Sequence, residues 1–309
     1  MIEISVIVCA HNSQMDYLGR VLEALRAQTL SCQQWELLVV DNRSDVPLKE
    51  RMDLTWHPQG RCVREDALGL TAARLRGIIE SRGEVLVFVD DDNVLDSDYL
   101  AQAREISVSH RQLGVWGGSI RGEFECPPPD WAQPHLPMLA IGEVNADRWS
   151  NERGASVCLP CGAGMCVRRP VAEAYRKAVL DDVDRGRLDR RGGELGSAGD
   201  TDIALTAFDV GLGTGVFRAL RLTHLIPRER LREDYLLRLM EGLSYSHVIL
   251  NARRGQPVPN AQIFRLRMLL RQIIWTLTLS RRARCFCLAS QNGQWRALKA
   301  LADQCPSSR

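Results

Sequence analysis

The chain has 309 residues, a length that suits one large domain or a domain of about 200–250 residues with an appendage. Hydrophobic residues make up 45% and charged residues 25%, which excludes a disordered or fibrous chain. The net charge of +2 argues against a nucleic-acid-binding protein, but it is unevenly spread: residues 263–309 carry +8, which leaves −6 for residues 1–262.

Alternating strands and helices are predicted for the first hundred residues. Three short apolar runs are expected to be strands: Ile4–Cys9, Trp35–Val40 and Val85–Val89. Segments with helical spacing separate them, one of them centred on Ala72–Ile79. Continuous Val, Ile and Leu strands of this kind indicate a Rossmann-like α/β fold, with a mostly parallel sheet and helices on both faces. Each run ends in polar residues, and in such sheets ligands bind beyond the carboxyl ends of the strands.

The middle of the chain changes character. Trp116–Phe124 alternates like an antiparallel strand, and Pro127–Pro134 is expected to be a stiff loop. Cys158–Val167 is predicted to be an apolar strand interrupted by glycines. Arg185–Ala198 is rich in glycine and charge, which predicts a mobile loop and a candidate lid before a helix over Thr201–Val210.

The last part of the chain has helical spacing throughout. We therefore expect a domain over residues 1–225 and a helical extension over 226–309, with a basic amphipathic tail from about residue 263. A helix drawn from Ile263 has two apolar strips. One holds Leu266, Leu270, Ile273, Ile274 and Leu277, and the other holds Phe264, Met268, Trp275 and Leu279. This tail either packs on the domain or lies peripherally on an anionic membrane surface.

The cysteines and the start of the chain bear on the compartment. Met1–Ser5 has no basic region before its apolar run, which predicts a strand rather than a signal peptide. Ten cysteines in such a chain are expected to be reduced thiols, so a cytoplasmic location is predicted. Cys158, Cys161 and Cys166 leave a structural zinc site as an alternative to buried apolar cysteines.

The strongest chemical signal is the run Asp90–Asn93 at the end of a predicted strand. Adjacent carboxylates repel one another and need a cation or a solvated rim. Their oxygens suit Mg²⁺ or Mn²⁺ that also takes phosphate oxygens, whereas the plainer alternative is a polar turn before a helix near Asp96. Asp41 and His11 end the other two strands, where each is either a turn residue or a contact to a nucleobase.

Five segments carry a family resemblance by their order and spacing. They are Ile4–Asn12, Glu36–Asp45, Gly69–Ile78, Val85–Asp92 and Gly199–Ile203. Together they resemble the family 2 glycosyltransferases. The resemblance implies a GT-A fold, a nucleotide-sugar donor, a divalent cation, a hydroxyl acceptor and inversion at the anomeric carbon. It also implies a nucleotide-sugar half of about 1–115 and an acceptor half of about 116–225.

The resemblance also implies roles for individual residues. Those expected on the nucleotide sugar are Ala10, His11, Asn12, Asp41, Arg74, Asp90 and Asp91. Asp92 and Asp90 match the metal-binding Asp-x-Asp pair, and His224 is either a further metal ligand or a packed histidine. Asp200 matches the general base, with Asp202 as a nearby alternative. The residues expected on the acceptor side are Gly162, Gly164, Met165, Trp131 and Asp202.

This sequence departs from the family pattern at three positions, Leu75, Gly164 and Gly199. Two other functions compete with glycosyl transfer. A nucleotide-sugar pyrophosphorylase would carry a Gly-rich loop with Lys or Arg after the first strand, and Cys9–Met15 has none. A non-catalytic assembly protein could keep the fold, although Asp90, Asp92 and Asp200 are all present. The expected acceptor is a saccharide or a lipid-linked molecule in glycoconjugate synthesis, and no nucleic acid partner is expected.

Overall fold

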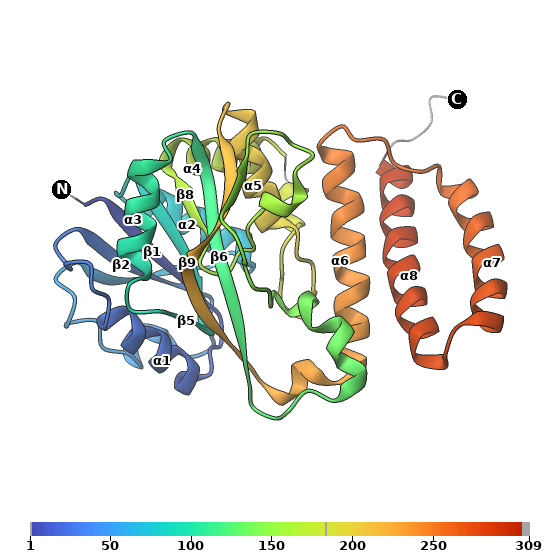
Figure 1. Ribbon diagram of the computed structural model, residues 1–309, viewed down its shortest axis with the longest axis horizontal. Helices are drawn as coiled ribbons and strands as arrows, with labels where there is room; N and C mark the ends of the chain where they lie inside the picture. Colours follow the sequence, from blue (N-terminus) through green and yellow to red (C-terminus); the bar gives the residue numbers. More distant parts are fainter. Residues whose placement is uncertain (1, 183, 305–309) are drawn as a thin grey trace.

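The computed structural model describes residues 2–182 and 184–304. Its centre is a nine-stranded sheet in the order β3-β2-β1-β4-β8-β6-β9-β5, with β7 paired to β9 (Figure 1). The strands are β1 (Ile4–Ala10), β2 (Trp35–Asn42), β3 (Gly60–Glu65), β4 (Val85–Asp90), β5 (Asn93–Leu95), β6 (Leu113–Phe124), β7 (Arg148–Ser150), β8 (Cys166–Arg168) and β9 (Gly213–Ile226). Most paired residues belong to the parallel ladders β1–β2, β1–β4, β2–β3 and β6–β9. The predicted α/β architecture is confirmed.

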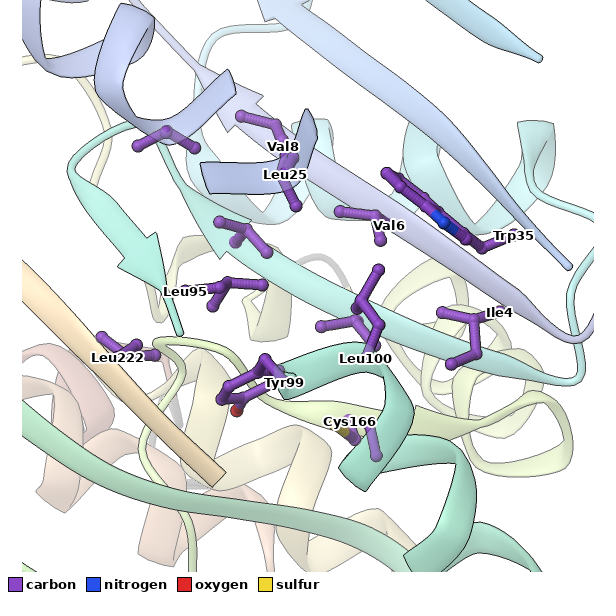
Figure 2. Packing of buried hydrophobic residues seen from close by; sticks show 14 of the residues in the cluster. Ile4, Val6, Val8, Leu25, Trp35, Leu95, Tyr99, Leu100, Cys166 and Leu222 are labelled. Carbon is purple, nitrogen blue, oxygen red and sulfur yellow. The ribbon is translucent and has the colours of Figure 1, made fainter. Parts of the chain in front are cut away.

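Helices cover both faces of this sheet. Because side chains alternate along a strand, Val6 and Val8 of β1 join a core with α1 and α3, whereas Ile7 and Cys9 join a core with α2, α4 and α5. Figure 2 shows the first core, where Val6 and Val8 lie beside Leu25 of α1. The helices are α1 (Met15–Arg26), α2 (Leu70–Glu80), α3 (Tyr99–Ser109), α4 (Arg169–Asp181) and α5 (Gly199–Asp209).

Two predictions for the middle of the chain need correction. The strand predicted over Trp116–Phe124 is antiparallel to β8, but its long ladder with β9 is parallel. Cys158–Val167 is not one strand, because Ser156–Cys158 forms a short 3₁₀ helix (η3) and β8 begins only at Cys166. Gly164 has φ +69°, a left-handed conformation that an extended strand cannot contain.

After β9 the described chain is helical. It forms the short η5 (Arg228–Leu231) and three long helices, α6 (Glu233–Arg253), α7 (Ala261–Thr278) and α8 (Arg281–Gln304). Buried Leu236 and Leu239 of α6 pack with Leu139 of η2 (Asp130–Leu139) and with Phe286 of α8. Figure 1 shows α6 against the sheet-containing part, then α8, then α7 outermost. Within the described residues, no helix combines the length and apolarity needed to cross a bilayer.

A buried carboxylate in β2 supports a first prediction. Glu36 is fully buried and accepts hydrogen bonds from Ser5 Oγ at 2.7 Å, Arg61 at 2.8 Å and the Arg82 backbone N–H at 2.6 Å. Burial by itself would raise its pKa, but these bonds outweigh it and lower the pKa from 4.5 to about 2. The folded pKa lies below the unfolded one, so this stabilisation is present above pH 4.5 and is lost as the pH falls toward 2.

We therefore expect Glu36→Gln to lower the free energy of unfolding by about 3 kcal/mol at pH 7. The difference between variant and wild type should shrink as the pH is lowered from about 4.5 toward 2. Urea denaturation of both proteins across this range measures it. A difference that stayed constant with pH would contradict a titrating Glu36.

Candidate functional site

A cavity of about 280 Å³ opens at the carboxyl ends of β1 and β4. Most of the predicted site residues line it, although they come from distant parts of the chain. They are Ala10, His11, Arg74, Asp90, Asp91, Asp92, Gly162, Asp200 and His224. The parallel sheet explains part of this meeting point, because β1 and β4 end at the same edge; Arg74 comes from α2, Asp200 from α5 and Gly162 from the loop before β8.

Strand pairing brings His224 to the aspartate run. Asn93 of β5 lies opposite His224 of β9, so Asp92 and His224 become neighbours. His224 Nε2 lies 3.3 Å from Asp92 Oδ2, and Arg230 donates to the same oxygen at 3.0 Å. Asp91 accepts a hydrogen bond from Ser13 Oγ. Arg230, which the sequence analysis did not single out, is therefore part of this site.

The three carboxylates have different charge environments. Burial and the charge of Asp92 raise the pKa of Asp90. Burial and the same charge raise the pKa of Asp91 to about 7. Burial also opposes the ionisation of Asp92, but His224 and Arg230 outweigh it and hold the pKa of Asp92 below its ordinary value. Of the three carboxylates, Asp92 is thus held most strongly in its ionised form, and it faces the imidazole and the guanidinium.

Asp92 and His224 lie close together and are candidate ligands of a divalent cation. His224 Nδ1 lies 2.9 Å from the carbonyl oxygen of Leu139; because a carbonyl only accepts, Nδ1 carries a proton and Nε2 is the nitrogen that faces Asp92. The guanidinium of Arg230 lies 3.0 Å from this Nε2 and 3.0 Å from Asp92 Oδ2, so both donors already face one positive group. Within the described residues, no group of three or more His, Cys, Asp or Glu side chains gathers closely enough to hold a metal ion.

Asp200 faces the cavity from the first turn of α5. Its Oδ2 accepts the backbone N–H of Gly162 at 3.0 Å. A Cβ atom at Gly162 would lie 2.8 Å from Nη2 of Arg74 and 3.3 Å from Oδ2 of Asp200. Only glycine therefore lets the chain pass between the arginine and the carboxylate.

Arg74 is held by a residue that the sequence analysis missed, Asp189. The two side chains are almost fully buried and form an ion pair at 2.9 Å between Nη1 and Oδ2. Burial by itself would lower the pKa of Arg74, but the charges of Asp189, Asp90 and Asp200 raise it above the ordinary value. Asp189 Oδ1 also accepts the backbone N–H of Gly199, which begins α5. The segment Arg185–Ala198, predicted to be a mobile loop, is thus anchored by the contacts of Asp189 with Arg74 and Gly199.

Two of the predicted nucleotide contacts, Asp41 and Asn12, do not line the cavity. Asp41 is buried and accepts the backbone N–H groups of Ser44 at 2.9 Å and Leu48 at 3.2 Å, so it closes the turn after β2. Asn12, at φ +49°, exchanges hydrogen bonds with Asp45. In the structure both residues stabilise the turns that follow β1 and β2 by hydrogen bonds. Their contact with a nucleotide stays a prediction.

The predicted acceptor residues are divided. Gly162 lines the cavity, but Gly164 and Met165 do not. The carbonyl oxygen of Gly164 accepts a hydrogen bond from Tyr99 Oη, and Met165 lies in the core. Trp131 lies under Arg282 of α8, with the guanidinium carbon 4.6 Å from the ring centre.

Asp202, the alternative base, is fully buried and paired with Arg185 and Arg254. It does not line the cavity, because on a helix it points away from Asp200 two residues earlier. Of the two candidate bases, the structure brings only Asp200 to the cavity.

Comparisons with known proteins point to one family. The model of the family described as glycosyl transferase family 2 matches residues 5–175. The putative glycosyltransferase EpsH of Bacillus subtilis (strain 168) is 30% identical over 128 residues, which are 40% of this chain and 35% of EpsH. Glycosyltransferase AglE of Haloferax volcanii is 28% identical over 127 residues, 40% of each chain. This chain therefore matches well under half the length of these relatives.

Solved structures share the fold. The crystal structure of S. aureus TarS 1-349 superposes with a TM-score of 0.53 at 15% identity, over 98% of this chain and 92% of that one. The same protein in complex with UDP-GlcNAc matches with a TM-score of 0.52 at 14% identity, over the same shares. At such identities the likeness shows the GT-A fold alone. Because the family model covers more than half of its length, the chain belongs to glycosyl transferase family 2.

Proposed function

We propose that this enzyme is a metal-dependent, inverting glycosyltransferase that moves a sugar from a nucleotide-diphosphate donor to a hydroxyl acceptor. The observation that carries the proposal is one cavity in which Asp90, Asp92, Arg74 and Asp200 all meet. TarS, which shares the fold, is known in complex with UDP and with UDP-GlcNAc. A uridine diphosphate sugar is therefore the first donor to test.

Each side of the cavity has a distinct task. Asp92, Asp90 and His224 would hold Mn²⁺ or Mg²⁺, and a cation bound there would supply Lewis-acid neutralisation of the leaving diphosphate. Arg74, fixed in its charged form among three carboxylates, binds the same diphosphate. Asp200 accepts the proton of the acceptor hydroxyl while the oxygen attacks the anomeric carbon from the face opposite the diphosphate. Deprotonation and departure thus occur on opposite sides of the sugar, which inverts the anomeric centre.

We propose further that the acceptor is a saccharide or a lipid-linked molecule and that the enzyme works in the cytoplasm, peripherally on the inner face of the membrane. The nine described cysteines that are free thiols suit a reducing compartment. Residues 263–309, with a charge of +8, are the part of the chain that would meet an anionic surface.

A donor screen tests the proposed function. Thermal shifts with UDP-, GDP- and dTDP-sugars, with and without Mn²⁺, should identify a donor whose stabilisation depends on the cation. Release of free nucleoside diphosphate from that donor separates a transferase from a non-catalytic assembly protein. A donor that binds without any release, in the presence of saccharide and lipid-linked acceptors, would favour the assembly function.

For Asp92→Asn we expect donor affinity in the presence of Mn²⁺ to fall at least about 10–100-fold, because even outer partners of a metal ligand are worth that much. The dependence of binding on Mn²⁺ should disappear at the same time. Isothermal titration of the donor with Mn²⁺ or with a chelator measures both effects. Asp98→Asn, an exposed carboxylate before α3, is the matched control and should bind like the wild type. Unchanged Mn²⁺ dependence in Asp92→Asn would contradict the assignment.

A further inference from the structure

Helix α7 carries an apolar surface that faces away from the protein. None of its 18 residues is buried, although its sequence is mostly apolar. Figure 1 shows it as the outermost element, with α8 between it and α6. The two predicted apolar strips have different surroundings: Phe264, Met268 and Trp275 are half-buried on the side of α8, and the other strip is exposed.

The exposed strip is continuous along the helix. Its members are between 51% and 82% exposed: Ile263, Leu266, Leu269, Leu270, Ile273, Ile274 and Leu277. At about 100° of rotation per residue, they lie on the side of α7 nearly opposite Phe264, Met268 and Trp275. A monomeric protein rarely leaves so many large apolar side chains together in water.

The charges beside this strip are all positive. Arg267 lies beside it on one side. Arg265 lies beyond its other side, with its guanidinium carbon 5.8 Å from the ring centre of Trp295 in α8, and Arg271 falls on the side of Phe264. The chain has no acidic residue between Glu241 and Asp303. A second copy of the same face would bring arginines against arginines across a two-fold axis, which opposes self-association. An anionic bilayer instead offers hydrocarbon for the strip and lipid phosphates for the guanidinium groups.

We propose that α7, and specifically its exposed strip, is the membrane-binding element of this enzyme and lies in the surface of an anionic bilayer. The inference rests on the proposed peripheral location and names the side chains that make the contact. It also divides the basic tail: α8 serves the packing of the protein, and α7 serves the membrane.

Helix α8 fixes α7 to the rest of the enzyme. Phe286 and Ala297 of α8 are buried against the core, and a Cβ at Gly293 would lie only 2.2 Å from the carbonyl oxygen of Glu241 in α6. Arg296 also pairs with Glu241 at 2.6 Å. Because α8 is packed so closely on α6, a bilayer bound by α7 would lie on the far side of α8 from the sheet-containing part of the enzyme.

The test uses the full chain with Leu266→Gln, Leu270→Gln and Ile273→Gln combined. Since these side chains are exposed, folding should be unaffected. Flotation with vesicles of equal parts phosphatidylcholine and phosphatidylglycerol should fall at least about tenfold relative to wild type. The matched control combines Ile79→Gln, Val108→Gln and Leu180→Gln, equally exposed apolar residues on the sheet-containing part, and should bind like the wild type. Pure phosphatidylcholine vesicles should bind the wild type weakly.

Three results would overturn the proposal. They are wild-type binding to neither vesicle, equal binding by the α7 variant, or a wild-type dimer that the α7 substitutions dissociate without any vesicle binding. Release of nucleoside diphosphate is measured in parallel without vesicles and should be the same for the α7 variant and wild type. If the wild type released none, the proposed function would fail independently of the vesicle result.

Discussion

Replacing Asp200 with asparagine is expected to lower turnover by about 10²–10⁴-fold, the usual contribution of a general base. Asparagine keeps the size of the side chain and an oxygen that can accept the Gly162 N–H, so the local backbone should persist. The change removes only the ability to take up the acceptor proton. Donor affinity should therefore stay near the wild-type value, and the loss should appear in kcat and in kcat/KM for the acceptor.

Asp209→Asn is the matched control for this experiment. Asp209 ends the same helix, is exposed and lies outside the cavity, so its substitution should leave turnover nearly unchanged. Steady-state rates for both variants, with donor affinity measured by titration, separate chemistry from binding. Near wild-type turnover in Asp200→Asn would show that another group takes the proton.

The donor half of the cavity could be predicted from the sequence because its signals are local. A hydrophobic strand followed at once by Asp90–Asp92 indicates where the strand ends and which side chains emerge there. Parallel pairing of β1 and β4 then brings His11 to the same edge. The resemblance to a family added Asp200, whose distance along the chain hides it from any local pattern.

Asp189 and Arg230 were not predicted from the sequence. The partner of Asp189 is distant along the chain, and Arg230 lies in an ordinary charged segment. Asp189 meets Arg74 across 115 positions of sequence, from a loop whose composition indicates only flexibility. Arg230 follows His224 by six residues in a run of charge that resembles any solvated turn. The one available signal was its position close in sequence to His224, a candidate metal ligand, because charged residues near a metal site contribute to its electrostatics.

The two apolar strips of α7 show what helical periodicity cannot predict. Periodicity gives the angular position of apolar residues, and both strips were predicted. It contains no information on which strip meets another helix. That choice depends on α8, which lies between α6 and α7 and leaves the other side of α7 uncovered.

For Asp189→Ala, the free energy of unfolding is expected to fall by about 3–5 kcal/mol, because the substitution leaves the guanidinium of Arg74 buried without its partner. Both side chains of the pair are less than 5% exposed, so water cannot replace the lost carboxylate. The Gly199 N–H and the Thr71 hydroxyl lose an acceptor at the same time. Urea denaturation, with midpoint and slope both fitted, measures the change.

The double variant Arg74→Met with Asp189→Leu separates the cost of an unpaired charge from the value of the pair. Replacing both members with apolar residues of similar volume is often nearly neutral, so the double variant should be more stable than Asp189→Ala although it alters more atoms. A loss below about 1 kcal/mol in Asp189→Ala would instead mean that Asp90 and Asp200, which also raise the pKa of Arg74, are enough to balance its charge. In that case Asp189 would position α5 through Gly199 alone, and Arg74 would depend on the carboxylates of the cavity itself.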